Sequence, residues 1–192
     1  MLSLCYNDRM PALLRKKSRI SPVRAKRTSI RFSIKQSSLG PTLIAATDAG
    51  VCSILFGDDA DRLAQELQRR FPRSALIEGD DQFNQIVSMV IDFIERPSST
   101  QTFPVDVRGT VFQKSVWEAL SRIPFGKTVS YSDIAKQIGH PKAVRAVAQA
   151  CGANNIAVAI PCHRVVRTDG ALAGYRWGVA RKAVLLERER RG

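Results

Sequence analysis

Apolar side chains recur at every second position near the start of the chain, which is typical of a strand with one buried face. Two further short apolar runs follow, and clusters of glycine, proline, serine and aspartate separate the three runs. The pattern therefore predicts three strands joined by turns. They are expected over Thr28–Lys35, Thr42–Ala46 and Val51–Phe56.

The apolar spacing then lengthens to three and four residues, which predicts helices. Asp58 and Asp59 can cap a first helix that Pro72 ends, and a second helix is expected over 81–95. One more strand is expected over Phe103–Val107. The buried faces are expected to be Leu63, Leu67 and Phe71 in the first helix and Phe83, Val87, Val90 and Ile94 in the second.

Two capping boxes predict helix starts in the second half of the chain. Thr110-x-x-Gln113 opens one helix, and Ser130-x-x-Asp133 opens a shorter one that runs through Ile138. A turn containing Gly139 leads into a third helix over 142–151. Two short helices joined in this way predict a helix-turn-helix whose second helix lies on DNA, with an ordinary helical hairpin as the alternative.

The helix over 142–151 carries few of the long polar side chains that a sequence-specific major-groove reader needs. It is therefore expected to lie close to DNA while reading little sequence. Its core face is predicted to be Val144, Val147, Ala148 and Cys151, and its outer face Lys142, Arg145, Ala146, Gln149 and Ala150.

A final helix is expected over 178–190. Its inward residues are predicted to be Val179, Ala183 and Leu186. Glu187 lies at the edge of this stripe, where a carboxylate needs a partner. On residue types alone, His163 and Arg181 are equal candidates for that partner.

Composition and charge narrow the class of protein. With 192 residues, 44% of them hydrophobic, the chain can bury a core in one or two domains. Its net charge of +13 is divided into +9 over residues 1–35, −5 over 36–109 and +9 over 110–192. Two basic ends suggest nucleic acid as a partner, although a solvated basic surface would look the same. Residues 1–27 are expected to be a flexible basic tail.

The cysteines show neither a metal-binding nor a disulfide pattern. They are Cys5, Cys52, Cys151 and Cys162. They have no CxxC spacing and only two histidines accompany them, so a reduced intracellular setting is expected and a zinc site is not. No stretch of the sequence reaches transmembrane length, and a secretion signal is not expected.

Candidate chemistry centres on Pro161-Cys162-His163. The proline restrains the backbone, so Cys162 is expected on a rigid, non-helical turn. A free thiol has a pKa of about 8.5 and needs a base or a positive charge to become a nucleophile. His163, Arg164 and Arg167 are candidates for both. A buried and unreactive cysteine is the alternative.

Four segments occur in order along the second half: SYSDIA (130–135), KAVRAVAQAC (142–151), PCHRV (161–165) and GYRWG (174–178). Together they resemble the O6-alkylguanine-DNA alkyltransferases, and among these the C-terminal part of the bacterial Ada proteins. The resemblance implies an α+β fold. A small ribonuclease H-like domain is expected over 28–108, and a mostly helical, winged-helix-like domain with a helix-turn-helix is expected over 109–192.

The resemblance also implies direct-reversal DNA repair by a methylated-DNA–protein-cysteine methyltransferase. The methyl group of O6-methylguanine, with O4-methylthymine as a second candidate, would pass irreversibly to Cys162 after the base is flipped out of double-stranded DNA. The protein would act once, as a cytoplasmic bacterial monomer, with no metal or cofactor. Glu187 would orient His163, which would take the thiol proton.

The resemblance assigns three groups of residues. The catalytic group is Cys162, His163, Glu187, Asn154 and Tyr131. The DNA-binding group is Arg145, which would replace the flipped base, with Tyr131, Ser132, Lys142, Ala146 and Gln149. The substrate pocket is Cys151, Val165, Leu172, Tyr175 and Arg176.

Three rival functions are less consistent with the sequence. An alkyltransferase-like protein that only flags lesions lacks the acceptor cysteine. A transcriptional activator of the Ada type needs upstream domains that residues 1–27 do not resemble. An unrelated cysteine hydrolase needs an oxyanion hole and a third orienting group.

Overall fold

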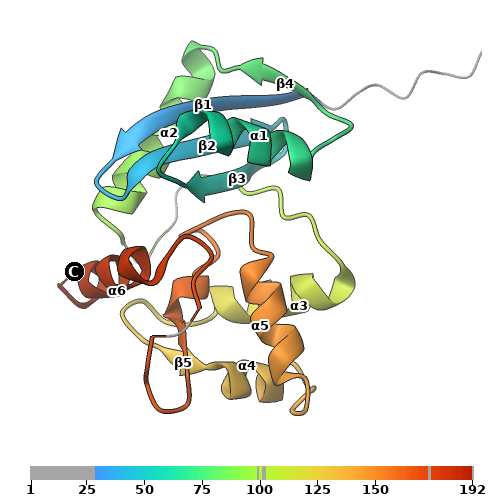
Figure 1. Ribbon diagram of the computed structural model, residues 1–192, viewed down its shortest axis with the longest axis vertical. Coiled ribbons are helices and arrows are strands. Elements are labelled where there is room, and N and C mark those ends of the chain that lie inside the picture. The colour runs from blue at the N-terminus through green and yellow to red at the C-terminus, as the bar shows by residue number, and fades with distance from the viewer. Residues whose placement is uncertain (1–28, 99, 101–102, 173, 192) are drawn as a thin grey trace, which may run out of the picture.

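The N-terminal half of the chain is a four-stranded sheet with two helices, as the computed structural model shows (Figure 1). The structure describes residues 29–98, 100, 103–172 and 174–191, so the tail predicted over 1–27 lies outside the described residues. The elements of this half are β1 (Ser29–Ser37), β2 (Gly40–Thr47), β3 (Gly50–Phe56), α1 (Ala60–Arg70), β4 (Ala75–Glu78) and α2 (Asp81–Glu95).

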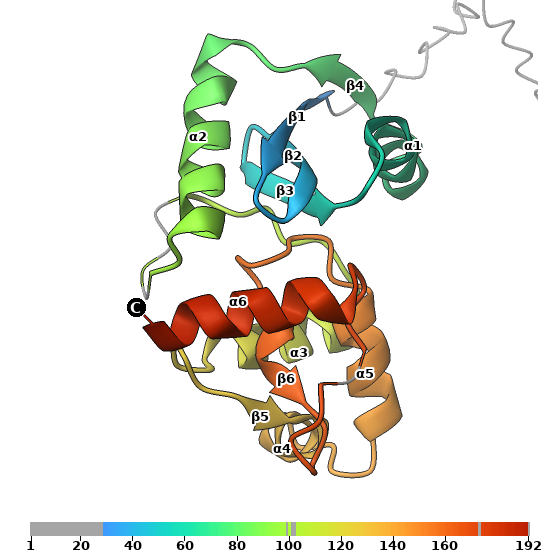
Figure 2. The ribbon, with the colours of Figure 1, turned by 60° about the vertical axis from the view of Figure 1, so that its left-hand side comes forward.

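The sheet has the strand order β3-β2-β1-β4, with β1, β2 and β3 antiparallel and β4 parallel to β1. The turn into β3 uses Gly50 at φ 140°, and a Cβ there would lie 2.7 Å from the carbonyl oxygen of Pro104. Figure 2 shows α2 on one side of the sheet and α1 on the other. Because both faces are covered, every residue of β3 is buried.

Both predicted helices of this half are confirmed. Asp59 caps α1 by accepting a hydrogen bond from the Arg62 amide at 2.8 Å, and Asp80 caps α2 through the Phe83 amide at 2.8 Å. Helix α1 ends at its cap residue Phe71, just before the proline. The apolar faces of both helices are buried as expected.

The C-terminal half is mostly helical. Its elements are α3 (Val111–Ser121), β5 (Val129–Ser130), α4 (Tyr131–Gln137), α5 (Val144–Gly152), the 3-10 helix η1 (Cys162–Arg164), β6 (Val165–Val166) and α6 (Val179–Arg191). Both capping boxes are formed, at Thr110–Gln113 and at Ser130–Asp133. Helices α3, α4 and α5 pack on one another, and α4 and α5 form the predicted helix-turn-helix. None of the helices in the described part of the chain is long and apolar enough to cross a membrane.

Several hydrogen bonds join the halves, and two sets of them hold α6 and the segment before the cysteine. Arg181 on α6 donates to the carbonyl oxygens of Leu39 at 2.7 Å and Gly57 at 3.0 Å, which fixes α6 against the sheet (Figure 2). At the free edge of β3, the Ile54 amide donates to the Asn155 carbonyl at 2.8 Å, and the Ala157 amide donates to the Ile54 carbonyl at 3.1 Å. The sheet edge therefore holds the segment that leads to the cysteine.

One strand prediction is wrong, and the short strands β4, β5 and β6 were not predicted. The segment Phe103–Val107 is not a regular strand, since Val105 makes only an isolated bridge to Val51. The sequence analysis also missed β4, a four-residue strand at the sheet edge that is too short to show a clear alternation.

The faces of α5 and α6 also differ from the predictions. On α5, Ala148 is exposed, whereas Ala150, expected on the outer face, is 2% exposed. On α6, Val179 and Ala183 are exposed. The buried residues of α6 are Lys182, Leu185 and Glu189. Two of these three are charged, so a search for apolar periodicity selects the wrong face.

Candidate active site

A cavity of about 310 Å³ opens beside Cys162. It is bounded by α4, α5, η1 and the loop before α6, and its volume lies at the lower end of the range for small-molecule sites. Its lining residues are Tyr131, Ala148, Cys151, Gly152, Cys162, Gly174, Tyr175 and Arg176. Cys162 begins η1 and is 4% exposed, so its thiol lies at the cavity wall and almost out of reach of bulk water.

The thiol of Cys162 is protonated unless its surroundings assist ionisation. Burial raises its pKa to about 11, while a hydrogen bond from Asn154 and the charge of Lys182 act in the opposite direction. Asn154 Nδ2 lies 3.2 Å from Cys162 Sγ and also donates to the Ile160 carbonyl at 2.9 Å. Because the thiolate is the reactive form, this site needs a base.

The turn that carries the cysteine is held rigid by Asn154. This side chain is fully buried, and its Oδ1 accepts a hydrogen bond from the Ile156 amide at 2.9 Å. Within the turn, Val158 has φ 60°, a conformation that is strained for a β-branched residue. Such strain persists only where the surrounding hydrogen bonds and packing enforce it.

His163, the predicted base, is held by a buried carboxylate. Its Nε2 lies 2.7 Å from Glu189 Oε1, and the side chains are 1% and 3% exposed. Burial by itself would raise the pKa of Glu189, but hydrogen bonds from His163 and Arg164 hold it at about 2. The ionised carboxylate keeps the imidazole proton on Nε2. Nδ1 is buried and has no hydrogen-bond partner among the described residues, so it carries a lone pair.

Burial also lowers the pKa of His163, although Glu189 opposes this effect. The imidazole is therefore neutral at neutral pH, as a proton acceptor must be. Arg164, a sequence candidate for activating the thiol, instead binds Glu189, with Nε 2.8 Å from Oε2 and Nη2 3.0 Å from Oε1.

The assignment of Glu187 as the partner of His163 is wrong. Glu187 pairs with Arg190 and with Arg191, whose Nε lies 2.8 Å from Glu187 Oε1, on the outer face of α6. Residues two apart on a helix point about 200° apart, so Glu187 and Glu189 cannot both face inward. Sequence analysis missed Glu189 because it stands between two arginines in a run that looks fully solvated.

Tyr131 reaches the cavity because of a short strand pairing. Ser130 in β5 pairs with Val166 in β6, and Tyr131 follows at the first position of α4. Burial, together with the nearby Cys151 and Cys162, raises the pKa of its phenol to about 12. The hydroxyl is therefore protonated at neutral pH.

The predicted pocket is only partly assembled. Cys151, Tyr175 and Arg176 line the cavity, but Val165 is fully buried behind it and Leu172 is 37% exposed outside it. Burial raises the pKa of Cys151 to about 12, above that of Cys162. Arg176 donates to the Gly152 carbonyl at 3.1 Å and forms an ion pair with Glu66 on α1.

The predicted DNA-binding residues lie together on α4 and α5. Lys142, Arg145 and Gln149 are exposed, whereas Ser132 and Ala146 are half-buried. Ala148 joins this surface to the cavity, which the sequence analysis did not expect. It also did not anticipate Lys182, which is fully buried and whose Nζ donates to the Val165 carbonyl at 2.5 Å.

Comparison with known proteins identifies the family. Residues 111–191 match the family described as 6-O-methylguanine DNA methyltransferase, DNA binding domain. The inducible methylated-DNA–protein-cysteine methyltransferase of Bacillus subtilis (strain 168) is 44% identical over 131 residues, which cover 68% of this chain and 73% of the relative. The chain belongs to the methylated-DNA–protein-cysteine methyltransferase family.

Two further relatives agree with this methyltransferase assignment. The bifunctional transcriptional activator/DNA repair enzyme Ada of Escherichia coli (strain K12) is 52% identical over 161 residues, 84% of this chain. The chain covers 46% of that protein and thus spans about half the length of the first curated relatives it matches. The crystal structure of Mycobacterium tuberculosis OGT in complex with DNA has a TM-score of 0.68 at 34% identity, and the match covers 85% of this chain and 93% of that one. The expected family and α+β fold are confirmed.

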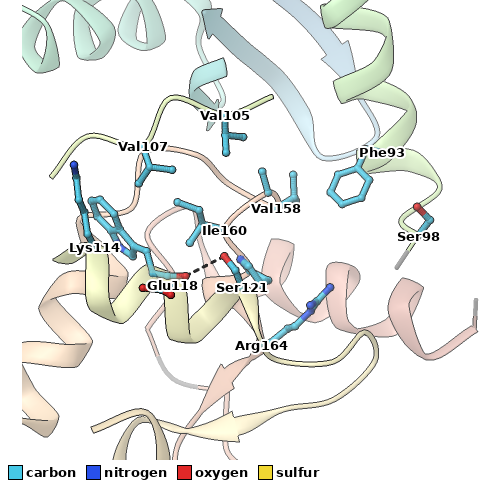
Figure 3. A pocket seen from close by; sticks show the side chains of 13 residues that line it. Phe93, Ser98, Val105, Val107, Lys114, Glu118, Ser121, Val158, Ile160 and Arg164 are labelled. Carbon is cyan, nitrogen blue, oxygen red and sulfur yellow. Dashed lines mark hydrogen bonds between the residues drawn. The ribbon is translucent and has the colours of Figure 1, made fainter. Parts of the chain in front are cut away.

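The chain has a second, larger cavity of about 440 Å³ between its halves. Figure 3 shows Phe93 and Val105 on one side of it and Glu118 and Ile160 on the other. Cys162 lines the smaller cavity and not this one, so the smaller cavity is the better site for chemistry. Among the described residues, no group of three His, Cys, Asp or Glu side chains is placed to hold a metal ion.

Proposed function

We propose that this protein repairs double-stranded DNA by transferring the methyl group of O6-methylguanine to its own Cys162. The observation that carries the proposal is the cavity-lining thiol next to a neutral histidine whose proton a buried carboxylate fixes on Nε2. The relatives include methylated-DNA–protein-cysteine methyltransferases, which supports the same reaction. Repair by direct reversal requires neither excision of the base nor synthesis of new DNA.

The DNA is expected to lie on the outer face of α5. The O6 atom is inside the duplex, so the nucleotide must rotate out at a cost of a few kcal/mol. We infer that Arg145, which is exposed, fills the space that the base leaves. Lys142 and Gln149 are exposed on the same surface and would contact the backbone. Ala148 and Gly152 connect this surface with the cavity, so a flipped base has a short path to Cys162.

The chemistry uses one proton acceptor and one proton donor. The Cys162 proton passes, through a water molecule, to His163 Nδ1, and the thiolate attacks the methyl carbon. The carbon–O6 bond breaks and its electron pair returns to guanine, which takes a proton from the Tyr131 hydroxyl. Tyr131 then regains a proton from His163, so the charges balance. Asn154 holds the cysteine turn during these steps.

The product is S-methylcysteine, a thioether with no facile route to release the methyl group. Each molecule would therefore act once, as a monomer in the cytoplasm. O4-methylthymine is a second candidate substrate. We also propose that the helical domain begins near residue 109 and that the preceding sheet domain supports it.

The decisive experiment measures the intact mass of the protein after incubation with an oligonucleotide duplex that holds one O6-methylguanine. We expect the wild type to gain one methylene per molecule and then to stop. Cys162→Ala should gain nothing. Cys151→Ala is the matched control, because it removes the other thiol of the same cavity, and it should still gain one methylene.

An unchanged mass with retained selective binding to the lesion would contradict methyl transfer and leave a damage-sensing protein. A methyl group on Cys151 in both the wild type and the Cys162→Ala variant would instead show that the acceptor is wrongly assigned.

A further inference from the structure

The larger cavity, of about 440 Å³ between the halves, plays no part in the methyl transfer proposed for the smaller one. Its volume lies within the range of small-molecule sites. Phe93 comes from α2, Trp117 from α3, and Val158 and Ile160 from the turn that precedes Cys162. Because these segments are far apart in the sequence, the cavity results from the packing of the two halves.

The walls of the larger cavity are mostly apolar. Ile160 and Val158 are 3% and 5% exposed, and Val105 is half-buried. The indole of Trp117 is 4% exposed, and its Nε1 donates to the Ala150 carbonyl at 2.8 Å, so the polar atom of this ring already has a partner. Such walls favour a ligand with an apolar body.

Three charged side chains line the larger cavity, and two of them are paired with opposite charges. Arg164 Nε lies 2.8 Å from Glu189 Oε2, and Glu118 forms an ion pair with Arg122. The third is Lys114, which is exposed on α3. The cavity therefore has a positive charge at its edge, and charge complementarity selects an anion.

Lys114 is able to bind that anion. It lowers the pKa of Asp106, so its ammonium group lies within electrostatic range of this carboxylate. Asp106 is, however, already bound by Arg108 at 2.7 Å and by the Thr47 hydroxyl at 2.8 Å. Figure 3 shows Lys114 at one end of the cavity and Phe93 at the other. An elongated ligand with a charge at one end fits this arrangement.

We propose that the larger cavity binds a small amphipathic carboxylate, with the carboxylate on Lys114 and the apolar body between Trp117 and Ile160. The ligand fills the space between the halves and stabilises the folded protein. Pro161, next to Cys162, also lines the cavity, so the ligand supports the turn that holds the thiol. This proposal predicts binding and stability, and it does not depend on methyl transfer.

The test uses octanoate as the probe, with octylamine as a ligand of equal chain length and opposite charge. NMR titration of labelled isoleucine and valine methyl groups in the wild type gives the affinity and the location of each probe. Signals of Ile160 and Val105 should shift to saturation, whereas Ile30 and Ile134, which do not line the cavity, should stay in place. We expect one octanoate per molecule, with a Kd of about 1 mM and weaker binding of octylamine.

Three variants identify the groups that bind octanoate. Lys114→Met should weaken octanoate binding about fivefold, as expected for an exposed ion pair. Ser121→Phe places a ring in the cavity from α3 and should abolish binding. Lys127→Met removes an exposed lysine outside the cavity and should bind as the wild type does. Octanoate should also raise the urea midpoint of the wild type but not that of Ser121→Phe.

Equal affinities of the wild type for octanoate and octylamine would overturn the proposal, as would an unchanged octanoate affinity in Lys114→Met. Methyl shifts that spread over the whole molecule without saturation would also overturn it, since they would show only general association with apolar surface. These outcomes are read from the wild type and from a variant at an exposed position, so they do not require Ser121→Phe to fold.

Discussion

The two halves of this protein bury different kinds of polar groups. In the sheet half, the buried polar side chains are all hydroxyls, namely Ser37, Thr42, Thr47 and Ser53. In the helical half they include an amide and four ionisable groups, namely Asn154, His163, Arg164, Lys182 and Glu189. The only described non-glycine residue with a positive φ, Val158, also belongs to the helical half. The costs of burial and strain are therefore concentrated around the cysteine.

This difference shows that the two halves of the fold have different roles. A buried charge is tolerated only when its partners are held in place, and a strained turn only when its ends are fixed. The sheet half supplies that support, because the edge of β3 pairs with the segment around Ile156 and Arg181 anchors α6 under the sheet. A half with no visible chemistry thus keeps the reactive half in its geometry.

The largest expected effect distinguishes the two glutamates of α6. Glu189→Gln removes the charge that His163 and Arg164 share, and breaking a buried pair in this way costs about 3–5 kcal/mol. Loss of the oriented base should also slow methyl transfer by about 100-fold. Glu187→Gln, two residues away on the outer face, should change stability by less than about 0.5 kcal/mol and leave the rate unchanged. Urea unfolding and single-turnover kinetics check both variants.

The opposite ranking, with Glu187→Gln the slow variant, would mean that Glu187 supports His163 as the family resemblance implied.

The next prediction tests whether the sheet half contributes only to stability and not to the reaction. Leu43 in β2 is fully buried, so Leu43→Ala should lower the free energy of unfolding by about 2–5 kcal/mol. Far below its unfolding midpoint, the variant should keep the pH profile of methyl transfer, because the chemistry lies in the other half. A shifted profile would show that the sheet controls ionisation at the cysteine.

Sequence reasoning predicted the elements that depend on local signals. The capping residues Asp59, Thr110 and Ser130 each place a helix start correctly, since a cap is a short-range hydrogen bond. The apolar face of α2 is also fully predicted, because only packing decides it. The strand β4 could not be predicted in this way, since its position depends on pairing with the distant β1.

The site is predictable where the family motif is contiguous and unpredictable where partners come from elsewhere in the chain. Asn154 contacts Cys162, and His163 follows the cysteine directly in the chain. Glu189 and Lys182 could not be found from periodicity, because buried charges reverse the pattern that identifies an inward face. The Arg176–Glu66 pair joins residues 110 positions apart, and no local signal marks it.

Acidification should reveal a smaller difference between the two halves, in the pH dependence of the free energy of unfolding. The pKa of Glu189 is lowered from 4.5 to about 2, which corresponds to about 3 kcal/mol of stability. That contribution is complete above about pH 4.5 and is lost as the pH falls through about 2. Urea unfolding between pH 2 and 6 should show this loss in the wild type and in Leu43→Ala. Glu189→Gln should lack it, and a parallel decline in that variant would assign the loss to other carboxylates.

The smallest expected effect tests whether the sheet half also shapes the cavity. Glu66 and Arg176 are each 27% exposed, and a pair of this kind contributes at most about 1 kcal/mol. Glu66→Gln should therefore destabilise the protein only slightly and change the methyl transfer rate by less than about fivefold. The difference in rate from the wild type should become smaller at high salt.

The matched control is Glu118→Gln. It breaks an exposed ion pair with Arg122 on α3, away from the cavity beside Cys162. Equal rates in both variants would show that the sheet supports the cysteine turn and α6 but not the cavity wall. A slower Glu66→Gln would instead extend the influence of the sheet to the loop before α6, which lines the cavity.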